Sequence, residues 1–159
     1  MNERILCVDS SALILLAEID SLPLLGPVAI VPAAVHREVL AGRYVHPSLS
    51  GIGSLNGFRM VEDVLLPSRI AEWGLGDGES QVLAHAALLS GSEAVIDDRQ
   101  ARQCARALGI AFTGTVGVLI RAKKNGSIPA ARPLLEDLLK RGMHLSRELA
   151  DAALGEVGE

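Results

Sequence analysis

The sequence predicts an α/β fold, with a central and mostly parallel sheet of about five strands covered by helices on both faces. Short apolar runs of strand type alternate along the chain with longer segments whose apolar residues recur at helical spacing. This alternation is typical of parallel sheets that are buried on both faces. At 159 residues, the chain is long enough for one domain with a sizeable core. Because no internal repeat or linker divides it, we expect a single domain over residues 1–159.

The composition indicates a folded protein outside the membrane. Apolar residues make up 49% of the chain and charged residues 21%, which argues against disorder. No apolar run approaches the roughly 18 residues that span a bilayer, and the N-terminal segment lacks the apolar stretch of a signal peptide. Cys7 and Cys104 form neither a disulfide framework nor a zinc pattern, so we expect a cytoplasmic protein. The net charge of -4 argues against a polycation that coats nucleic acid.

Local patterns predict the individual elements. Five short apolar runs, each followed or preceded by turn residues, are predicted as strands over residues 5–9, 28–32, 58–62, 93–97 and 110–114. Seven segments with helical spacing are predicted as helices over residues 11–19, 32–42, 76–91, 97–109, 114–126, 131–142 and 146–154. The stretch 43–57 is rich in Gly, Ser and Pro and is predicted as a loop with room for one helical turn.

Acidic residues stand at the ends of two predicted strands. Asp9 ends the first strand, and Asp97 and Asp98 end the fourth. In open parallel sheets, ligands bind beyond the carboxyl ends of the strands, where the strand order reverses. These carboxylates are therefore the first candidates for a functional site.

Further acids fall on the apolar side of predicted helices. At 100° per residue, Glu38 lies between Ala34 and Val35, so it is predicted to face the sheet. Glu79 and Asp98 also lie on the apolar stripes of their helices. A carboxylate on such a face is costly unless it is paired or bound to a metal, and no Lys or Arg sits there to pair with it. The pattern predicts a divalent cation, and oxygen ligands suit Mg²⁺ or Mn²⁺.

Each acid also has a structural interpretation. Asp9, which two serines follow, is equally suited to cap the first helix. Glu79 is in the first helical turn, where any acid interacts favourably with the helix dipole. The two aspartates at the fourth strand end could supply a cap and a first-turn charge, and Glu38 could form a solvated pair with Arg37. Their joint occurrence at strand ends and on inward faces favours a metal site over these separate roles.

The segments that carry these acids resemble the PIN-domain family, in its compact prokaryotic branch that includes toxins of the VapC type. The resemblance extends from Ile5 to about Leu149, and it rests on the order and spacing of several short motifs. These are VDSSALILLAEI, VPAAVHREV, GLGDGESQVLAHA, VIDDRQARQCARALGI and TGTVGVLIRAKKNGSI.

The resemblance implies a set of site residues. The family's four acids match Asp9, Glu38, Glu79 and, at the fourth strand, Asp98, which are the predicted catalytic residues. The predicted metal ligands are Asp9, Glu79, Asp98 and Asp97. Many members have Thr-x-Asp where this chain has Ile-Asp-Asp, so the family hydroxyl is absent and the choice between the two aspartates stays open. Ser10, which matches the small hydroxyl residue after the first acid, and Thr115, which is placed to cap the helix facing the site, are predicted to contact the substrate. Arg99 and Arg102, which follow the acid pair, are predicted to contact phosphates that flank the cut, and a solvated helix face is an equally good interpretation of each.

The family also implies an activity. Its members use Mg²⁺ or Mn²⁺ to hydrolyse phosphodiester bonds, usually of RNA, and bacterial members are often toxins that a cognate antitoxin protein inhibits. We therefore expect an endoribonuclease that binds RNA, and a homodimer, as in many relatives. The alternative is a catalytically inert PIN fold that binds RNA or a protein partner. Aromatic residues make up only 3% of the chain, which predicts recognition by shape and backbone rather than by base stacking.

Overall fold

A central sheet of five parallel strands forms the middle of the molecule, as the sequence predicts. The computed structural model describes residues 4–159. The strand order is β3-β2-β1-β4-β5, and all four pairs are parallel. The strands are β1 (Ile5–Val8), β2 (Val28–Pro32), β3 (Phe58–Val61), β4 (Ser92–Val95) and β5 (Phe112–Thr113). Each lies within its predicted segment or within one residue of it.

All seven predicted helices are present, with ends that differ from the prediction by a few residues. They are α1 (Ser10–Glu18), α2 (Ala33–Leu40), α5 (Asp77–Leu88), α6 (Arg99–Leu108), α7 (Thr115–Lys124), α8 (Arg132–Lys140) and α9 (Arg147–Gly155). The remaining helical turns are α3 (Pro47–Ser50) and α4 (Ser68–Ala71), with the 3₁₀ turns η1 (Leu22–Leu25) and η2 (Ile52–Ser54). Of these, only the turns between residues 43 and 57 were anticipated. Single turns are too short to show a helical period.

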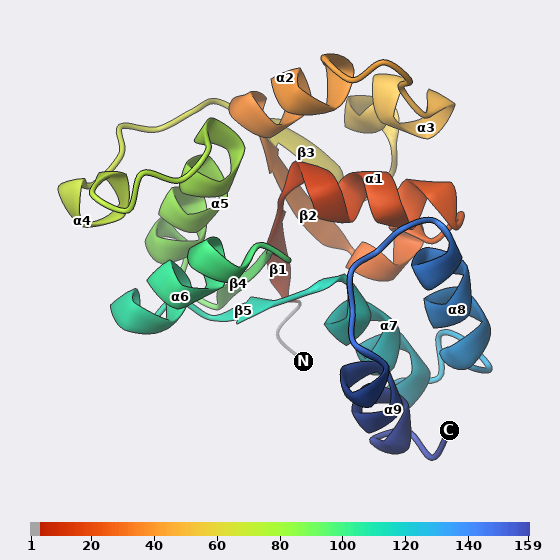
Figure 1. The fold of residues 1–159 in the computed structure, drawn as a ribbon. Helices are drawn as coiled ribbons and strands as arrows, with labels where there is room; N and C mark the ends of the chain where they lie inside the picture. The colour runs from red at the N-terminus through yellow and green to blue at the C-terminus, as the bar shows by residue number, and fades with distance from the viewer. Residues whose placement is uncertain (1–3) are drawn as a thin grey trace.

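Helices cover the sheet on both sides and complete a three-layer sandwich. Figure 1 shows α5 and α6 on one side of the strands and α1, α7, α8 and α9 on the other. Helix α5 crosses the sheet in contact with β1, β2 and β4, and it also packs against α2. This arrangement explains why the strands are continuous apolar runs rather than alternating ones, since both of their faces are covered.

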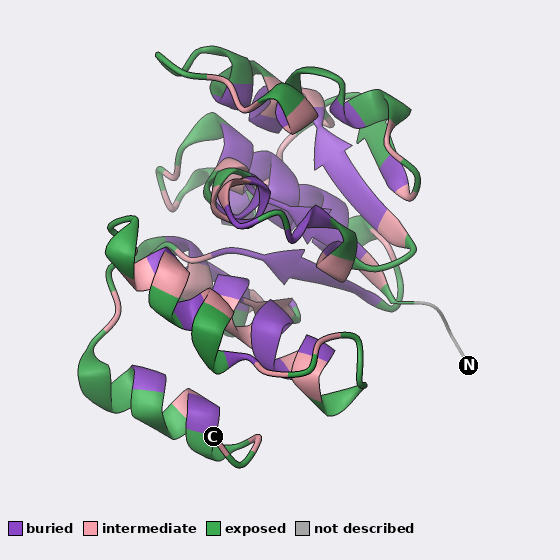
Figure 2. Cartoon of the chain, turned by 90° about the vertical axis from the view of Figure 1, so that its right-hand side faces the viewer, coloured by how far each residue is buried: buried purple, intermediate pink, exposed green. Residues whose placement is uncertain are grey.

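The core lies between the two helical layers and the sheet. Figure 2 shows the central strands and most of α5 as buried, whereas the outer faces of the terminal helices are exposed. Cys7 in β1 and Cys104 in α6 are both fully buried and unpaired by disulfide, as their segments predict. In the part of the chain that the structure describes, no helix has the length and apolar character needed to cross a membrane.

The connections place a topological switch point at the carboxyl ends of β1 and β4. From β1 the chain moves outward to β2 and β3, then returns to β4 on the other side of β1. Helices α1 and α6, which follow these two strands, diverge from this point, as expected at a topological switch point. The register pairs Val8 with Val95, and the Asp9 amide donates to the Val95 carbonyl oxygen at 3.1 Å. Residues just beyond these strands therefore meet at one edge of the sheet.

Candidate functional site

Asp9 lies at this switch point. It follows β1 directly, and only 3% of its surface is exposed. Its Oδ2 atom is 3.4 Å from the Ser11 hydroxyl, whereas its buried Oδ1 atom has no hydrogen-bond partner among residues 4–159. Asp9 stands at the N-cap position of α1, but within the described chain its side chain makes no capping hydrogen bond. The capping alternative therefore does not account for this residue.

The surroundings of Asp9 oppose its ionisation. Burial raises the pKa of its carboxyl, a hydrogen bond from the Ser10 amide lowers it, and the negative charges of Glu79 and Glu38 raise it further. The result is a pKa of about 7, compared with 3.8 for an unperturbed aspartate. At neutral pH, a positive charge beside Asp9 would be strongly favoured.

Glu79 is the second acid near the carboxyl ends of β1 and β4. It lies in the first turn of α5 and is half-buried. Burial is the main cause that raises the pKa of its carboxyl, and the negative charges of Asp98 and Glu38 raise it further. A hydrogen bond from the Gly76 amide lowers this pKa in part. Glu79 therefore connects acids from four separate segments into one electrostatic group. We call this group the carboxylate cluster, and its members are Asp9, Glu38, Glu79 and Asp98.

Glu38 reaches the cluster from α2, on the side of α5. Its Oε2 accepts a hydrogen bond from the Ser10 hydroxyl at 2.9 Å, and its Oε1 accepts one from the Gly78 amide at 2.8 Å. Contrary to the prediction from the helical wheel, Glu38 is exposed rather than turned into the apolar core. The wheel gives the direction around the helix axis, but α2 begins where β2 ends, so this side of the helix meets Ser10 and Gly78 rather than the core.

Arg37 and Glu38 are both exposed, as the solvated interpretation predicts, but they do not pair with one another. Arg37 pairs instead with Asp63, with its Nη2 atom 2.7 Å from Oδ2 of that carboxylate. The other carboxylate oxygen of Asp63 accepts a hydrogen bond at 2.9 Å from the amide of Ala34, in the first turn of α2. Asp63 thus holds the start of α2 and leaves Glu38 free to face the cluster.

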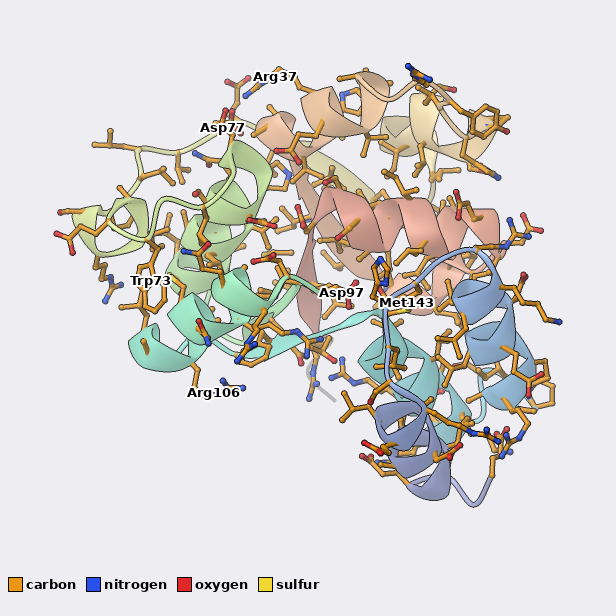
Figure 3. The ribbon with its side chains drawn as sticks, viewed as in Figure 1. Arg37, Trp73, Asp77, Asp97, Arg106 and Met143 are labelled. Carbon is orange, nitrogen blue, oxygen red and sulfur yellow. The ribbon has the colours of Figure 1, made fainter. Side chains whose placement is uncertain are left out.

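Asp98 and Asp97 have different roles in the structure. Asp98 is the N-cap of α6, where its Oδ2 accepts a hydrogen bond from the Ala101 amide at 2.9 Å, and its charge acts on Glu79. It is exposed, so the predicted apolar environment is again absent. Asp97, labelled in Figure 3, accepts two hydrogen bonds from Thr115, from the amide at 2.9 Å and from the hydroxyl at 2.5 Å. Each oxygen of Asp97 therefore already has a donor.

Thr115 is out of reach of a substrate in this structure. Its side chain is completely buried, and its hydroxyl is used by Asp97. The prediction that it contacts substrate must be corrected, because the residue instead joins the start of α7 to the end of β4. The N-cap of α7 is Gly114 rather than the threonine. A Cβ atom at Gly114 would collide first with the guanidinium of Arg102 and would lie 2.7 Å from Oδ1 of Asp97, so the glycine makes room for both side chains.

The other three predicted substrate contacts lie around the same edge. Ser10 is half-buried, with its hydroxyl directed to Glu38. Arg99 and Arg102 line a groove of about 710 Å³ that also includes Asp97 and Met143, both labelled in Figure 3. Arg99 is exposed. Arg102 is more constrained, since its Nε donates to the Ile96 carbonyl oxygen at 2.9 Å and its guanidinium lies 5.7 Å from the centre of the Phe112 ring.

The residues fit a divalent cation by their chemistry, although the cluster is open. Across residues 4–159, no three His, Cys, Asp or Glu side chains form a group that could hold a metal ion as they stand. The fit rests on the unpartnered buried oxygen of Asp9 and on the mutual repulsion that raises the pKa of Asp9 and Glu79.

Comparison with known proteins identifies a matching family model. A family model described as a PIN domain matches residues 5–159, which is nearly the whole chain. A search of curated proteins found no match to this chain. The family match covers all elements of the sheet and every residue of the carboxylate cluster.

Proposed function

The chain belongs to the PIN-domain family, and we propose on that premise that it is an endoribonuclease that uses Mg²⁺ or Mn²⁺ to hydrolyse RNA. The observation that carries the proposal is Oδ1 of Asp9, a buried carboxylate oxygen without a hydrogen-bond partner among residues 4–159. Buried polar atoms are otherwise almost always paired. Two neighbouring acids, Glu38 and Glu79, further disfavour its negative charge. A cation bound at this oxygen would remove both penalties.

The roles of the acids follow from their surroundings. Asp9 and Glu79 would bind the metal, together with the oxygen of Asp98 that does not cap α6. A bound Mg²⁺ or Mn²⁺ would lower the pKa of a water molecule and offset the charge of the phosphate. Glu38 would orient the attacking water, since donors from α1 and α5 already hold both of its oxygens. Asp97, whose oxygens accept hydrogen bonds from Thr115, would keep α7 in place rather than bind metal.

The substrate would lie across the carboxylate cluster and enter the groove beside Asp97. Arg99 and Arg102 line this groove beside Asp97, so their guanidinium groups would meet phosphates that flank the cut. The net charge of -4 means that such contacts must be local. RNA binding should therefore be modest and salt-dependent rather than a general affinity for polyanions.

Cleavage of a mixed RNA panel with Mn²⁺ or Mg²⁺ tests the proposal. Protein purified free of any bound inhibitor should cleave at least one RNA, and chelation should abolish cleavage. Asp9→Asn should eliminate the activity but retain RNA binding, because it removes a metal ligand and one source of repulsion against phosphate. Asp151→Asn is the matched control, since it makes the same change at an exposed position of α9. An inert binding module would bind RNA and cleave none in any variant.

We further propose that the protein is a toxin that an antitoxin partner inhibits. Expression in bacteria without such a partner tests the toxin role. A toxin should arrest growth as the wild type and as Asp151→Asn, and not as Asp9→Asn. Normal growth with active wild-type protein would separate the ribonuclease from the toxin function. Light scattering of the purified protein tests the homodimer.

A further inference from the structure

The geometry around Glu38 points to a positioning role for Gly78, the second residue of α5. The Gly78 amide donates a hydrogen bond to Oε1 of Glu38 at 2.8 Å. This contact joins α2 to α5, two helices that pack closely against one another. Gly78 is itself buried and directly precedes Glu79. The residue therefore stands between two acids of the carboxylate cluster.

Only glycine leaves room for the carboxylate at this point. A Cβ atom built on Gly78 would lie 2.5 Å from Oε2, 2.8 Å from Oε1 and 2.8 Å from Cδ of Glu38. Gly78 does not have a positive φ angle, so its backbone conformation suits any residue. The need for glycine is therefore one of space, and the three atoms nearest to the added Cβ all belong to Glu38.

This distinguishes Gly78 from Gly76 and Gly155. At Gly76, on the same helix end, an added Cβ would come no closer than 3.8 Å, to Oε2 of Glu79. At Gly155, the last residue of α9, it would meet nothing within 4 Å. Alanine is a better helix former than glycine, so a fold under no other demand would gain from alanine at position 78.

We propose that Gly78 is a positioning residue for Glu38, and this inference deepens the proposed function, on which its catalytic part rests. The amide of Gly78 and the hydroxyl of Ser10 hold the two oxygens of Glu38 from opposite sides. The absence of a Cβ lets the carboxylate approach the amide. Glu38 thereby keeps one orientation beside Asp9 and Glu79, as a group that orients water must.

Gly78→Ala tests this role, with Gly155→Ala as the matched control. The end of a glutamate side chain moves easily, so we expect Gly78→Ala to fold with an unchanged or higher Tm while Glu38 is displaced. The kcat for RNA cleavage should fall about 10–100-fold, as when a supporting contact of an active site is lost, with KM for RNA unchanged. Gly155→Ala should leave both constants unchanged. A Gly78→Ala enzyme with wild-type kcat would overturn the inference.

A double-mutant cycle tests the contact without relying on activity. In a Glu38→Ala background, Gly78→Ala has no carboxylate to displace, so it should raise Tm by more than it does in the wild type. Equal changes in both backgrounds would overturn the positioning role, whatever the protein catalyses. Wild-type protein that neither cleaves RNA nor is stabilised by Mn²⁺ would sink the proposed function instead, and the cycle would still decide whether Gly78 positions Glu38.

Discussion

Thr115 donates two hydrogen bonds to Asp97, from its amide and from its hydroxyl. Asp97 lies eighteen residues earlier in the chain, just after β4. The amide lies 2.9 Å from Oδ1, and the hydroxyl lies 2.5 Å from Oδ2. Arg102 approaches Oδ1 as well, with its Nη2 at 3.7 Å. This relationship fixes the start of α7 against the end of β4, and it separates the two adjacent aspartates by role.

Replacing Thr115 with valine should therefore affect stability rather than RNA binding. Valine keeps the shape but leaves Oδ2 of the half-buried Asp97 without its donor, which should cost about 1 kcal/mol in the free energy of unfolding. Thr115→Ser keeps the hydroxyl and should lose less. Denaturant titration measures the first effect, and RNA affinity should be equal in all three proteins. A large loss of affinity in folded Thr115→Val would restore the predicted substrate contact.

Asp9 should make the stability of the apo protein depend on pH. Its pKa of about 7 in the folded state lies above the unperturbed 3.8, so the native state binds this proton more tightly than the unfolded state. The free energy of unfolding should therefore fall as the pH rises from about 4 to about 7. Asp9→Asn lacks this dependence and should be more stable than the wild type at about pH 8. The measurement is denaturation of both proteins across this pH range. Parallel pH profiles of the free energy of unfolding would contradict the prediction.

Asp63 should make the stability of the protein depend on pH in the opposite direction. Burial raises the pKa of its carboxyl, but hydrogen bonds from Arg37 and Ala34 and the charge of Arg37 lower it more, so the net direction is downward. Its contribution to stability is present above the unfolded pKa and is lost as the pH falls through the lowered folded value. At neutral pH, Asp63→Ala should destabilise by about 1 kcal/mol, as for a lost helix cap. Asp63→Asn keeps an acceptor for the Ala34 amide and should lose less.

Added metal should stabilise the wild type more than a variant that lacks a ligand. A metal that binds only the native state raises the free energy of unfolding by about 2.7 kcal/mol when its free concentration is about one hundred times its dissociation constant. Millimolar-range Mn²⁺ should therefore raise the Tm of the wild type and of Asp151→Asn, and raise that of Asp9→Asn much less. Thermal denaturation with and without chelator measures the shift. The same shift in all three proteins would place the metal elsewhere.

The two groove arginines should differ in what they contribute. Arg99 is exposed, so Arg99→Ala should leave stability within about 0.5 kcal/mol of the wild type. If it contacts a phosphate, its loss should weaken RNA binding and make the salt dependence shallower by about one charge. Arg102→Ala should also lower stability, since it removes the contacts with Ile96 and Phe112. Affinity measured over a salt series, with denaturation beside it, distinguishes these effects.

The sequence by itself determined the layers of the fold and the position of its acids along the chain. Continuous apolar strands between helical segments require a parallel sheet covered on both faces, and the order of strands and helices follows from periodicity. Asp9 and the pair Asp97 and Asp98 were placed at strand ends for the same reason. These conclusions depend on neighbours within a few residues, which a sequence displays directly.

Only the tertiary structure decided which groups hold each acid. The helical wheel placed Glu38 towards the core, whereas it is exposed and accepts hydrogen bonds from Ser10 and Gly78, because a wheel does not show where the sheet ends. The partners of Asp97 and of Glu38, Thr115 and Gly78, lie 18 and 40 residues away in the chain. Such contacts arise when separate helices meet at one edge of a sheet. Their distances, and the space that a missing Cβ leaves, exist only once the chain is folded.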